Sequence, residues 1–312
     1  MKINILLLSP LCLLLFGCNV GTKHRHLSSD FKEKHKALLM KAFDIEDQDA
    51  IRSICLINNS ICIENEHVSP IFNFYDEKGM KNGSFGNIGH GKGEFIMPHL
   101  CEGEKDTMIV IDNGSKMLSS VYNMNTCHSE KSDIGHNVNK LKTIRWPYVG
   151  YYHYMHNKIS WDIYNVEKKE LIESIAFEGE EPHLETFVWS SYNEHLVFAY
   201  KYYNKFRICK LSPQMTLQDE IIYEANLQEP REDKCYYSDI VCCKDFFVVL
   251  SQRDVVSKAN NVNSKIQIYN YLGTPLKELS LDNIYLNMVW NERKNQLYLL
   301  PWDRNELKYV QL

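Results

Sequence analysis

Six short runs of apolar, β-branched and aromatic residues recur along the chain, and each of them follows a turn. The runs begin at Ser60, Thr107, Lys158, His195, Phe246 and Gln296. Successive starts are 47, 51, 37, 51 and 50 residues apart, which is close to the ~40–50-residue period of β-propeller blades. The spacing therefore predicts an all-β fold, a six-bladed β-propeller.

Each run, taken as part of a blade, needs an inner strand before it. Candidates for five units are Ile51–Ile57, Ile96–Cys101, Phe187–Tyr192, Tyr236–Cys243 and Tyr285–Trp290. The third unit leaves two alternatives: Tyr148–Tyr154 is its inner strand, or Leu141–Trp146 is and the tyrosine-rich stretch comes second. Outer strands separated by polar turns are expected at Ile71–Tyr75, Met117–Tyr122, Phe206–Leu211 and Ile266–Tyr271.

The last unit stops at Leu312 after two or three strands, whereas Ala37–Phe43 has no unit of its own. We expect this N-terminal segment to supply the missing outer strand, because pairing the two ends of the chain closes the ring and removes an open edge. The alternative is an amphipathic helix over 30–41, in which Asp30 and Glu33 form a capping pair.

The N-terminus has the pattern of a targeting signal. Lys2 precedes the apolar stretch Ile3–Phe16, which is too short to cross a bilayer as a helix. The stretch ends in the letters LFGC at Cys18. An ordinary secretory signal with a chance cysteine is the alternative to what this ending resembles, a bacterial lipobox.

The resemblance to a lipobox implies that residues 1–17 are removed and that Cys18 carries acyl chains that anchor the protein to a membrane. Residues 18–36 then form a polar tether, and residues 37–312 the propeller. Asn19 is not the aspartate that commonly retains lipoproteins at the inner membrane, so the resemblance implies an outer-membrane lipoprotein of the cell envelope.

Charge excludes one class of partner. Lys2 leaves with the signal, so the formal net charge changes from −5 to −6. Such a chain lacks the basic footprint of a nucleic-acid-binding protein. The cluster Lys23-His24-Arg25-His26 is expected to be a solvated part of the tether.

Eight cysteines remain after Cys12 in the signal and Cys18 are set aside. Cys55 and Cys62 lie opposite each other if Asn58-Asn59 is a two-residue hairpin turn. A disulfide is then possible, but buried free thiols are the expected state, since most of these cysteines lie within apolar strand runs. No Cys-x-x-Cys spacing indicates a structural zinc site.

The string from Gly86 to Pro98, GNIGHGKGEFIMP, resembles the G-x-G-x-G-x-F-x-x-P segment of NHL-type propeller repeats. Together with the lipobox and the six units, the chain resembles the TolB-like six-bladed propeller lipoproteins of Bacteroides-type bacteria. A phosphate-binding loop is the competing interpretation of these glycines. It requires Lys-Ser or Lys-Thr opening a helix, whereas Glu94-Phe95 leads into a predicted strand.

Motifs of catalysis are weak. The sequence has no Gly-x-Ser-x-Gly or His-Glu-x-x-His, and the acidic group Glu178–Glu181 is typical of a solvated loop. Some related propellers bind a metal in the central channel. Here His153 is the one plausible ligand on the predicted inner strands, and a lone strand histidine is more often structural. No cofactor is expected.

Prolines recur in the loops that precede the predicted inner strands. Pro-His-Leu occurs at 98–100 and again at 182–184, and Pro147 and Pro230 hold comparable places. Such loops converge at one mouth of a propeller channel, so six residues are predicted to form a binding surface: His99, Arg145, Trp146, Tyr148, His183 and Arg231. The alternative is that these prolines only start strands and the aromatic residues only pack between blades.

Two functions therefore remain open. The first is a non-catalytic binding module that recognises a protein, peptide or glycan at the channel mouth. The second is a metal-dependent hydrolase or lyase whose site lies in the channel. Missing acidic and histidine ligands on the inner strands favour binding.

Overall fold

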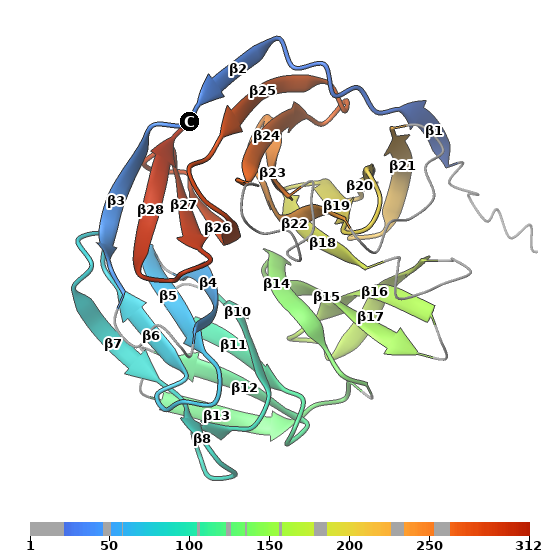
Figure 1. The fold of residues 1–312 in the computed structure, drawn as a ribbon. Coiled ribbons are helices and arrows are strands. Elements are labelled where there is room, and N and C mark those ends of the chain that lie inside the picture. Colours follow the sequence, from blue (N-terminus) through green and yellow to red (C-terminus); the bar gives the residue numbers. More distant parts are fainter. Residues whose placement is uncertain are drawn as a thin grey trace, which may run out of the picture.

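The computed structural model describes ten ranges: 22–45, 51–57, 59–104, 107–122, 126–134, 136–155, 158–177, 186–225, 234–252 and 263–312. Their strands form six sheets around a central axis (Figure 1), which confirms the predicted six-bladed β-propeller. Within these ranges no helix is long and apolar enough to cross a membrane.

Each blade is an antiparallel sheet of four strands, and the chain enters at the innermost one. The first three blades are β4 (Ile51–Ile57), β5 (Ser60–Asn65), β6 (Phe72–Tyr75) and β7 (Lys81–Phe85); β10 (Pro98–Glu102), β11 (Thr107–Asp112), β12 (Met117–Tyr122) and β13 (Thr126–Lys131); and β14 (Asn139–Arg145), β15 (Tyr148–Met155), β16 (Lys158–Asn165) and β17 (Glu170–Phe177).

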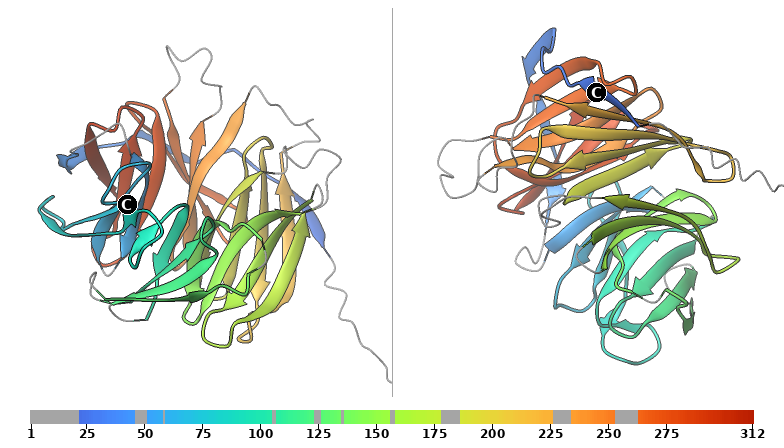
Figure 2. Two further views of the ribbon diagram at one scale, coloured as in Figure 1. Left: turned by 90° about the horizontal axis from the view of Figure 1, so that it is seen from below. Right: turned by 90° about the vertical axis from the view of Figure 1, so that its right-hand side faces the viewer.

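The remaining blades have the same order, and Figure 2 shows the ring from its edge. They are β18 (Phe187–Tyr192), β19 (His195–Tyr200), β20 (Lys205–Leu211) and β21 (Leu217–Glu224); β22 (Cys235–Cys242), β23 (Phe246–Gln252), β24 (Lys265–Asn270) and β25 (Pro275–Ser280); and β26 (Tyr285–Asn291), β27 (Gln296–Pro301), β28 (Glu306–Gln311) and β3 (Leu39–Asp44). A short parallel pair, β8 (Asn87–Ile88) and β9 (Glu94–Phe95), connects the first two blades.

The order of strands in the third blade distinguishes the two alternatives for its inner strand. β14 is innermost and the tyrosine-rich β15 is second, so the alternative with Leu141–Trp146 inside is correct. The apolar run that begins at Lys158 is consequently the third strand of its blade. This explains why the interval to the next run is the shortest of the five.

The ring closes through the N-terminal strand, as predicted. β3 pairs antiparallel with β28, and Leu39 lies opposite Val310. Phe43 of β3 is buried and stacks on Tyr75 of β6 in the first blade, with ring centroids 5.3 Å apart. The alternative helix over 30–41 is wrong, because this range contains β-strands that pair with the propeller.

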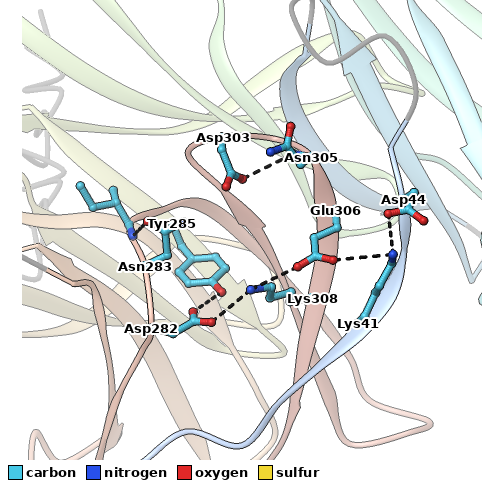
Figure 3. A network of polar contacts seen from close by, with 10 residues as sticks. Lys41, Asp44, Asp282, Asn283, Tyr285, Asp303, Asn305, Glu306 and Lys308 are labelled. Atoms are coloured by element: carbon cyan, nitrogen blue, oxygen red, sulfur yellow. Dashed lines mark hydrogen bonds and ion pairs between the residues drawn. The ribbon is translucent and has the colours of Figure 1, made fainter.

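Polar contacts lie along the outer side of this closure (Figure 3). Lys41 pairs with Asp44 at 2.6 Å and approaches Glu306 at 3.8 Å. Lys308 pairs with Glu306 at 3.3 Å and with Asp282 at 3.1 Å. Surface ion pairs of this kind contribute little, so the burial of Phe43 and the strand pairing carry the closure.

The described part of the segment predicted to be a tether contacts the propeller. β1 (Lys23–His26) adds to β21, and β2 (Glu33–Lys36) adds to β25, both as parallel fifth strands at the rim of the ring (Figures 1 and 2). Leu27 and Phe31 between them are buried. These two apolar side chains explain why a polar, exposed segment follows the outer edges of two blades.

The core consists of layers between neighbouring blades. Between the third and fourth blades, Trp161 meets Trp189 edge to face, with ring centroids 5.1 Å apart. Gly150 lies against both indoles: a Cβ there would be 2.6 Å from Trp161 and 2.7 Å from Trp189. Only a glycine permits this approach, so the backbone of β15 is part of the aromatic layer.

Cys55 lies opposite Cys62 across β4 and β5, which confirms the predicted register of these two cysteines. All eight cysteines of the described residues are free thiols, and six of them are buried. Burial raises the pKa of the Cys101, Cys209 and Cys242 thiols to about 12.

Candidate binding site at the central channel

All inner strands run in the same direction, so their beginnings meet at one end of the channel and their ends at the other. A cavity of about 240 Å³ at the first end, here the front cavity, has nine polar lining residues: Arg52, Ser53, Glu64, His99, Asn139, Lys140, Lys142, Asp239 and Asn287. A second cavity of about 730 Å³ at the other end, the rear cavity, includes Glu102, Thr143, Tyr192, Trp290 and Glu292. Six residues line both, which makes one channel: Ile54, Cys55, Leu100, Leu141, Lys142 and Met288.

Glu64 is the first of two acidic groups in the front cavity. Its carboxylate accepts a hydrogen bond from the Ser53 hydroxyl at 2.5 Å and pairs with Arg52 at 3.2 Å. Burial raises the pKa of Glu64, while the charge of Arg52 and the bond from Ser53 oppose this shift. The charge of Glu64 is therefore matched within the first blade.

Asp239 is the second acidic group, and it is buried. Its Oδ2 accepts the backbone N–H of Met288 at 2.8 Å, and its Oδ1 accepts the N–H of Ile240 at 2.9 Å. Oδ2 thus holds the fifth blade against the sixth, while Oδ1 bonds to the next residue of its own strand. Neither oxygen forms an ion pair with a cation of the described residues.

Lys142 lies where the two cavities join, half-buried on β14. Its ammonium donates to the backbone carbonyl of Trp189 at 2.8 Å. No carboxylate of the described residues is within ion-pair distance of it. Burial lowers the pKa of Lys142, and the charge of Asp239 opposes that shift. An ammonium that has lost water and gained one neutral acceptor retains capacity to bind an anion.

Lys140 extends the positive lining outward from Lys142. It is exposed at the start of β14, and its ammonium forms no ion pair with a carboxylate of the described residues. Arg52, Lys140 and Lys142 thus place three cations around the front cavity, against the two carboxylates Glu64 and Asp239, and Glu64 forms an ion pair with Arg52. The cavity therefore favours anions although the chain carries a net negative charge.

His99 faces the same cavity from β10 and stays neutral at physiological pH. Burial lowers its pKa to about 4, and the nearby charges of Arg52 and Lys140 add to the shift, while Asp112 opposes it. A neutral imidazole offers one donor and one acceptor. It adds hydrogen bonding to the cavity without further charge.

The predicted site residues do not all meet. His99 lines the front cavity, but Arg145, Trp146 and Tyr148 lie at the end of β14, toward the rear. The hydroxyl of Thr143, two residues before Arg145, bonds to Glu102 at the far end of β10, which fixes this orientation. The prediction assumed that Pro147 precedes an inner strand, whereas it lies in the turn that follows one.

Each of these three residues makes local contacts. Arg145 donates to the Pro213 carbonyl at 2.7 Å, and the Trp146 indole donates to Glu167 at 3.2 Å. Tyr148 packs against the aromatic layer between the third and fourth blades. His183, Arg231 and Cys18 lie outside the described residues.

Sequence reasoning missed the cations of the front cavity. Strand periodicity could not have paired Lys140 with Lys142, because Lys140 has a positive φ and the register of β14 shifts between Asn139 and Lys142. Arg52 comes from another blade and had no local signal. For metals, the described residues contain one cluster of three convergent ligand residues, at the third blade, and none of them lines either channel cavity.

Comparison with known proteins establishes the fold and nothing finer. No family model matches the sequence, and no curated protein matches it. A DUF4221 family member from Bacteroides vulgatus has a TM-score of 0.61 at 10% identity over 89% of this chain and 98% of that one. A Bacteroides fragilis protein named as exported has a TM-score of 0.53 at 9% identity over 93% and 98%. The Pan2 WD40 domain of Neurospora crassa has a TM-score of 0.55 at 8% identity over 92% and 98%.

Proposed function

We propose that the protein is a non-catalytic recognition module that binds an anionic group of a protein, peptide or glycan at the front of its channel. The observation that carries this proposal is the Lys142 ammonium, which is desolvated at the base of the front cavity and has no carboxylate partner among the described residues. Lys140 and Arg52 widen the positive surface around it.

A carboxylate or phosphate of a partner matches this lining better than a neutral group does. It replaces the water that the Lys142 ammonium has lost and accepts charge-assisted hydrogen bonds from it. Neutral His99 adds a hydrogen bond at the rim. The front cavity accommodates one such group, so we propose that the rest of the partner lies across the loops at the mouth, to which the sequence pattern assigns His183 and Arg231.

The metal-dependent hydrolase or lyase is the weaker alternative. Such an enzyme needs three or more ligands in the channel, whereas the front cavity has three cations against two carboxylates, and this excess of positive charge disfavours a metal ion.

We further propose that the module is an outer-membrane lipoprotein of a Bacteroides-type cell envelope, of the TolB-like and NHL-like kind, anchored through Cys18. The lipobox resemblance supports this, as does the similarity in fold to a Bacteroides fragilis protein named as exported. Cys18→Ser should release a folded propeller from the membrane fraction. Retention of that variant with its signal intact would contradict the anchor.

Calorimetric titration with a short glutamate-rich peptide tests the anion proposal. We expect Lys142→Met to weaken binding at least tenfold, and the matched variant Lys81→Met, an exposed lysine on the outer strand β7, to leave it unchanged. Alanine at His183 or Arg231 should also weaken binding with little change in melting temperature. Equal affinities of the Lys142 and Lys81 variants would refute the proposal.

A further inference from the structure

A cluster of titratable side chains on the third blade is not used by the channel. His153 lies on β15 and Asp162 on β16, while His136 comes from the segment that connects β13 to β14. The Nε2 atoms of His153 and His136 lie 3.1 and 3.5 Å from the same Asp162 oxygen, Oδ2. One ligand atom from each residue lies within 4.8 Å of the other two.

The cluster is buried and incompletely bonded. The His153 and Asp162 side chains are 4% and 2% exposed, and His136 is 26% exposed. Two of its nitrogens, His136 Nε2 and His153 Nδ1, are buried without a hydrogen-bond partner. Buried polar atoms in native proteins are nearly always satisfied, so these two nitrogens indicate a missing partner. His136 Nε2 faces the Asp162 carboxylate, whereas His153 Nδ1 lies on the opposite side of its ring from the Nε2 atom that does so.

The Asp162 carboxylate is held in place by a neighbour. Its other oxygen, Oδ1, accepts a hydrogen bond from the Ser174 hydroxyl at 2.7 Å, which orients the carboxylate toward the histidines. Such outer hydrogen bonds on a ligand are typical of metal sites.

We propose that His136, His153 and Asp162 bind one divalent transition-metal ion of the Zn²⁺ class. Two imidazoles and one carboxylate are ligands that Zn²⁺ and its neighbours in the first row prefer, whereas Ca²⁺ and Mg²⁺ require oxygen ligands. The partial exposure of His136 leaves a path for the ion and a position for water. The two rings are stacked, with centroids 3.6 Å apart, so their nitrogens lie close together. Binding of the ion turns these nitrogens toward a common point.

The position of the site defines what the ion does. His136 precedes the inner strand of the third blade, and His153 and Asp162 lie on the two strands outside it. A bound ion therefore fastens the segment between the second and third blades to the third sheet. This is a structural role, in which metal binding adds to folding stability, and it is separate from recognition at the channel.

Metal-stripped protein, titrated with Zn²⁺ by calorimetry and analysed by mass spectrometry for metal content, tests the site. We expect one Zn²⁺ ion per chain and a melting temperature that Zn²⁺ raises and Mg²⁺ does not. With Co²⁺ in place of Zn²⁺, we expect the visible spectrum of a low-coordinate Co²⁺ ion. His136→Ala and Asp162→Asn should each lower the affinity at least tenfold. His128→Ala, an exposed histidine on β13, is the control and should leave it unchanged.

Two outcomes overturn the assignment. One is Zn²⁺ that remains bound with equal affinity in the His136→Ala and Asp162→Asn variants, since the exposed histidines of β1 would then hold it. The other is no binding and no change in melting temperature for the unaltered protein, which would make the cluster a simple His–Asp pair. Lys142→Met should keep the metal, so failure of one proposal is distinguishable from failure of the other.

Discussion

Trp189 of the fourth blade holds the Lys142 ammonium of the third, which also lies over the Trp189 ring, 5.8 Å from its centroid. The Lys142 ammonium donates to the Trp189 carbonyl at 2.8 Å, and the Trp189 indole N–H donates to the carbonyl of Lys140 at 3.0 Å. The ammonium is thus positioned by backbone and ring rather than by a carboxylate. A cation fixed in this way is ready for a ligand before the ligand arrives.

Lys142→Met should leave the free energy of unfolding unchanged or raise it by about 1 kcal/mol, because methionine fills the same space without a desolvated charge. Urea denaturation of both proteins measures this. A loss of more than about 1 kcal/mol would mean that the bond to the Trp189 carbonyl serves the fold more than it serves binding.

Gly150→Ala should destabilise the protein by roughly 1–3 kcal/mol, because the new methyl group overlaps Trp161 and Trp189. Combined with Trp189→Phe, which removes one of the two obstructing rings, the alanine should cost less than it does alone. Denaturant midpoints for the two single variants and the double variant give the coupling. Strict additivity would show that the indole does not limit this position.

Acidification should destabilise the protein through His99. Its folded pKa of about 4 lies below the ordinary value of 6.5, so the unfolded chain binds the proton more readily. The contribution of neutral His99 to the free energy of unfolding is complete above pH 6.5. It is lost as the pH falls toward 4, which lowers that free energy by up to about 3 kcal/mol. In His99→Gln the loss over this window should be smaller. Identical pH profiles of stability in the two proteins would contradict the shift.

Phe43→Ala should cost roughly 3–5 kcal/mol, since it removes a buried ring that joins the closing strand to Tyr75 of the first blade. Leu38→Ala, one residue before β3, is the control, because Leu38 is 78% exposed and its truncation should change little. Thermal unfolding of both variants checks the contrast. A small effect at Phe43 would place the stability of the closure in the strand pairing alone.

Thiol reactivity should follow burial. Iodoacetamide at mildly alkaline pH should first modify Cys55 and Cys235, which are half-buried, and leave the six buried cysteines unmodified until the protein is unfolded. Burial raises the pKa of the buried thiols such as Cys101, which lowers their thiolate fraction further. Mass spectrometry of native and urea-treated samples distinguishes the two groups. Rapid native labelling of Cys101 would contradict the packing between the second and third blades.

The repeat of apolar runs was sufficient to predict the six blades and the closing strand, because strand spacing follows from the size of a blade. The bounds of β4 and β12 were predicted to the residue. The third blade was ambiguous, because Tyr148–Met155 and Lys158–Asn165 are equally apolar and the turn between them is short. The strands β1 and β2 were missed, since their parallel pairing depends on two apolar residues, Leu27 and Phe31, in an otherwise polar segment.

The binding site was less predictable for a physical reason. Arg52, Lys140 and Lys142 come together only because inner strands of different blades face one axis, and no local pattern encodes that convergence. The predicted site was based on prolines in loops, and the loop after Arg145 lies at the opposite end of the channel from His99. The metal-ligand cluster had the same difficulty, since His136 approaches His153 and Asp162 from outside their strands.

The pairing of β3 with β28 also sets an order in time. β3 is synthesised before the strands of all six blades and its partner after nearly all of them, so the sixth blade is the last to be completed and this contact is among the most distant in the chain. A chain that stops before Glu306 leaves β3 and β27 with unpaired edges, which are templates for joining another molecule. Premature termination should therefore yield aggregates or strand-exchanged dimers rather than a smaller working ring.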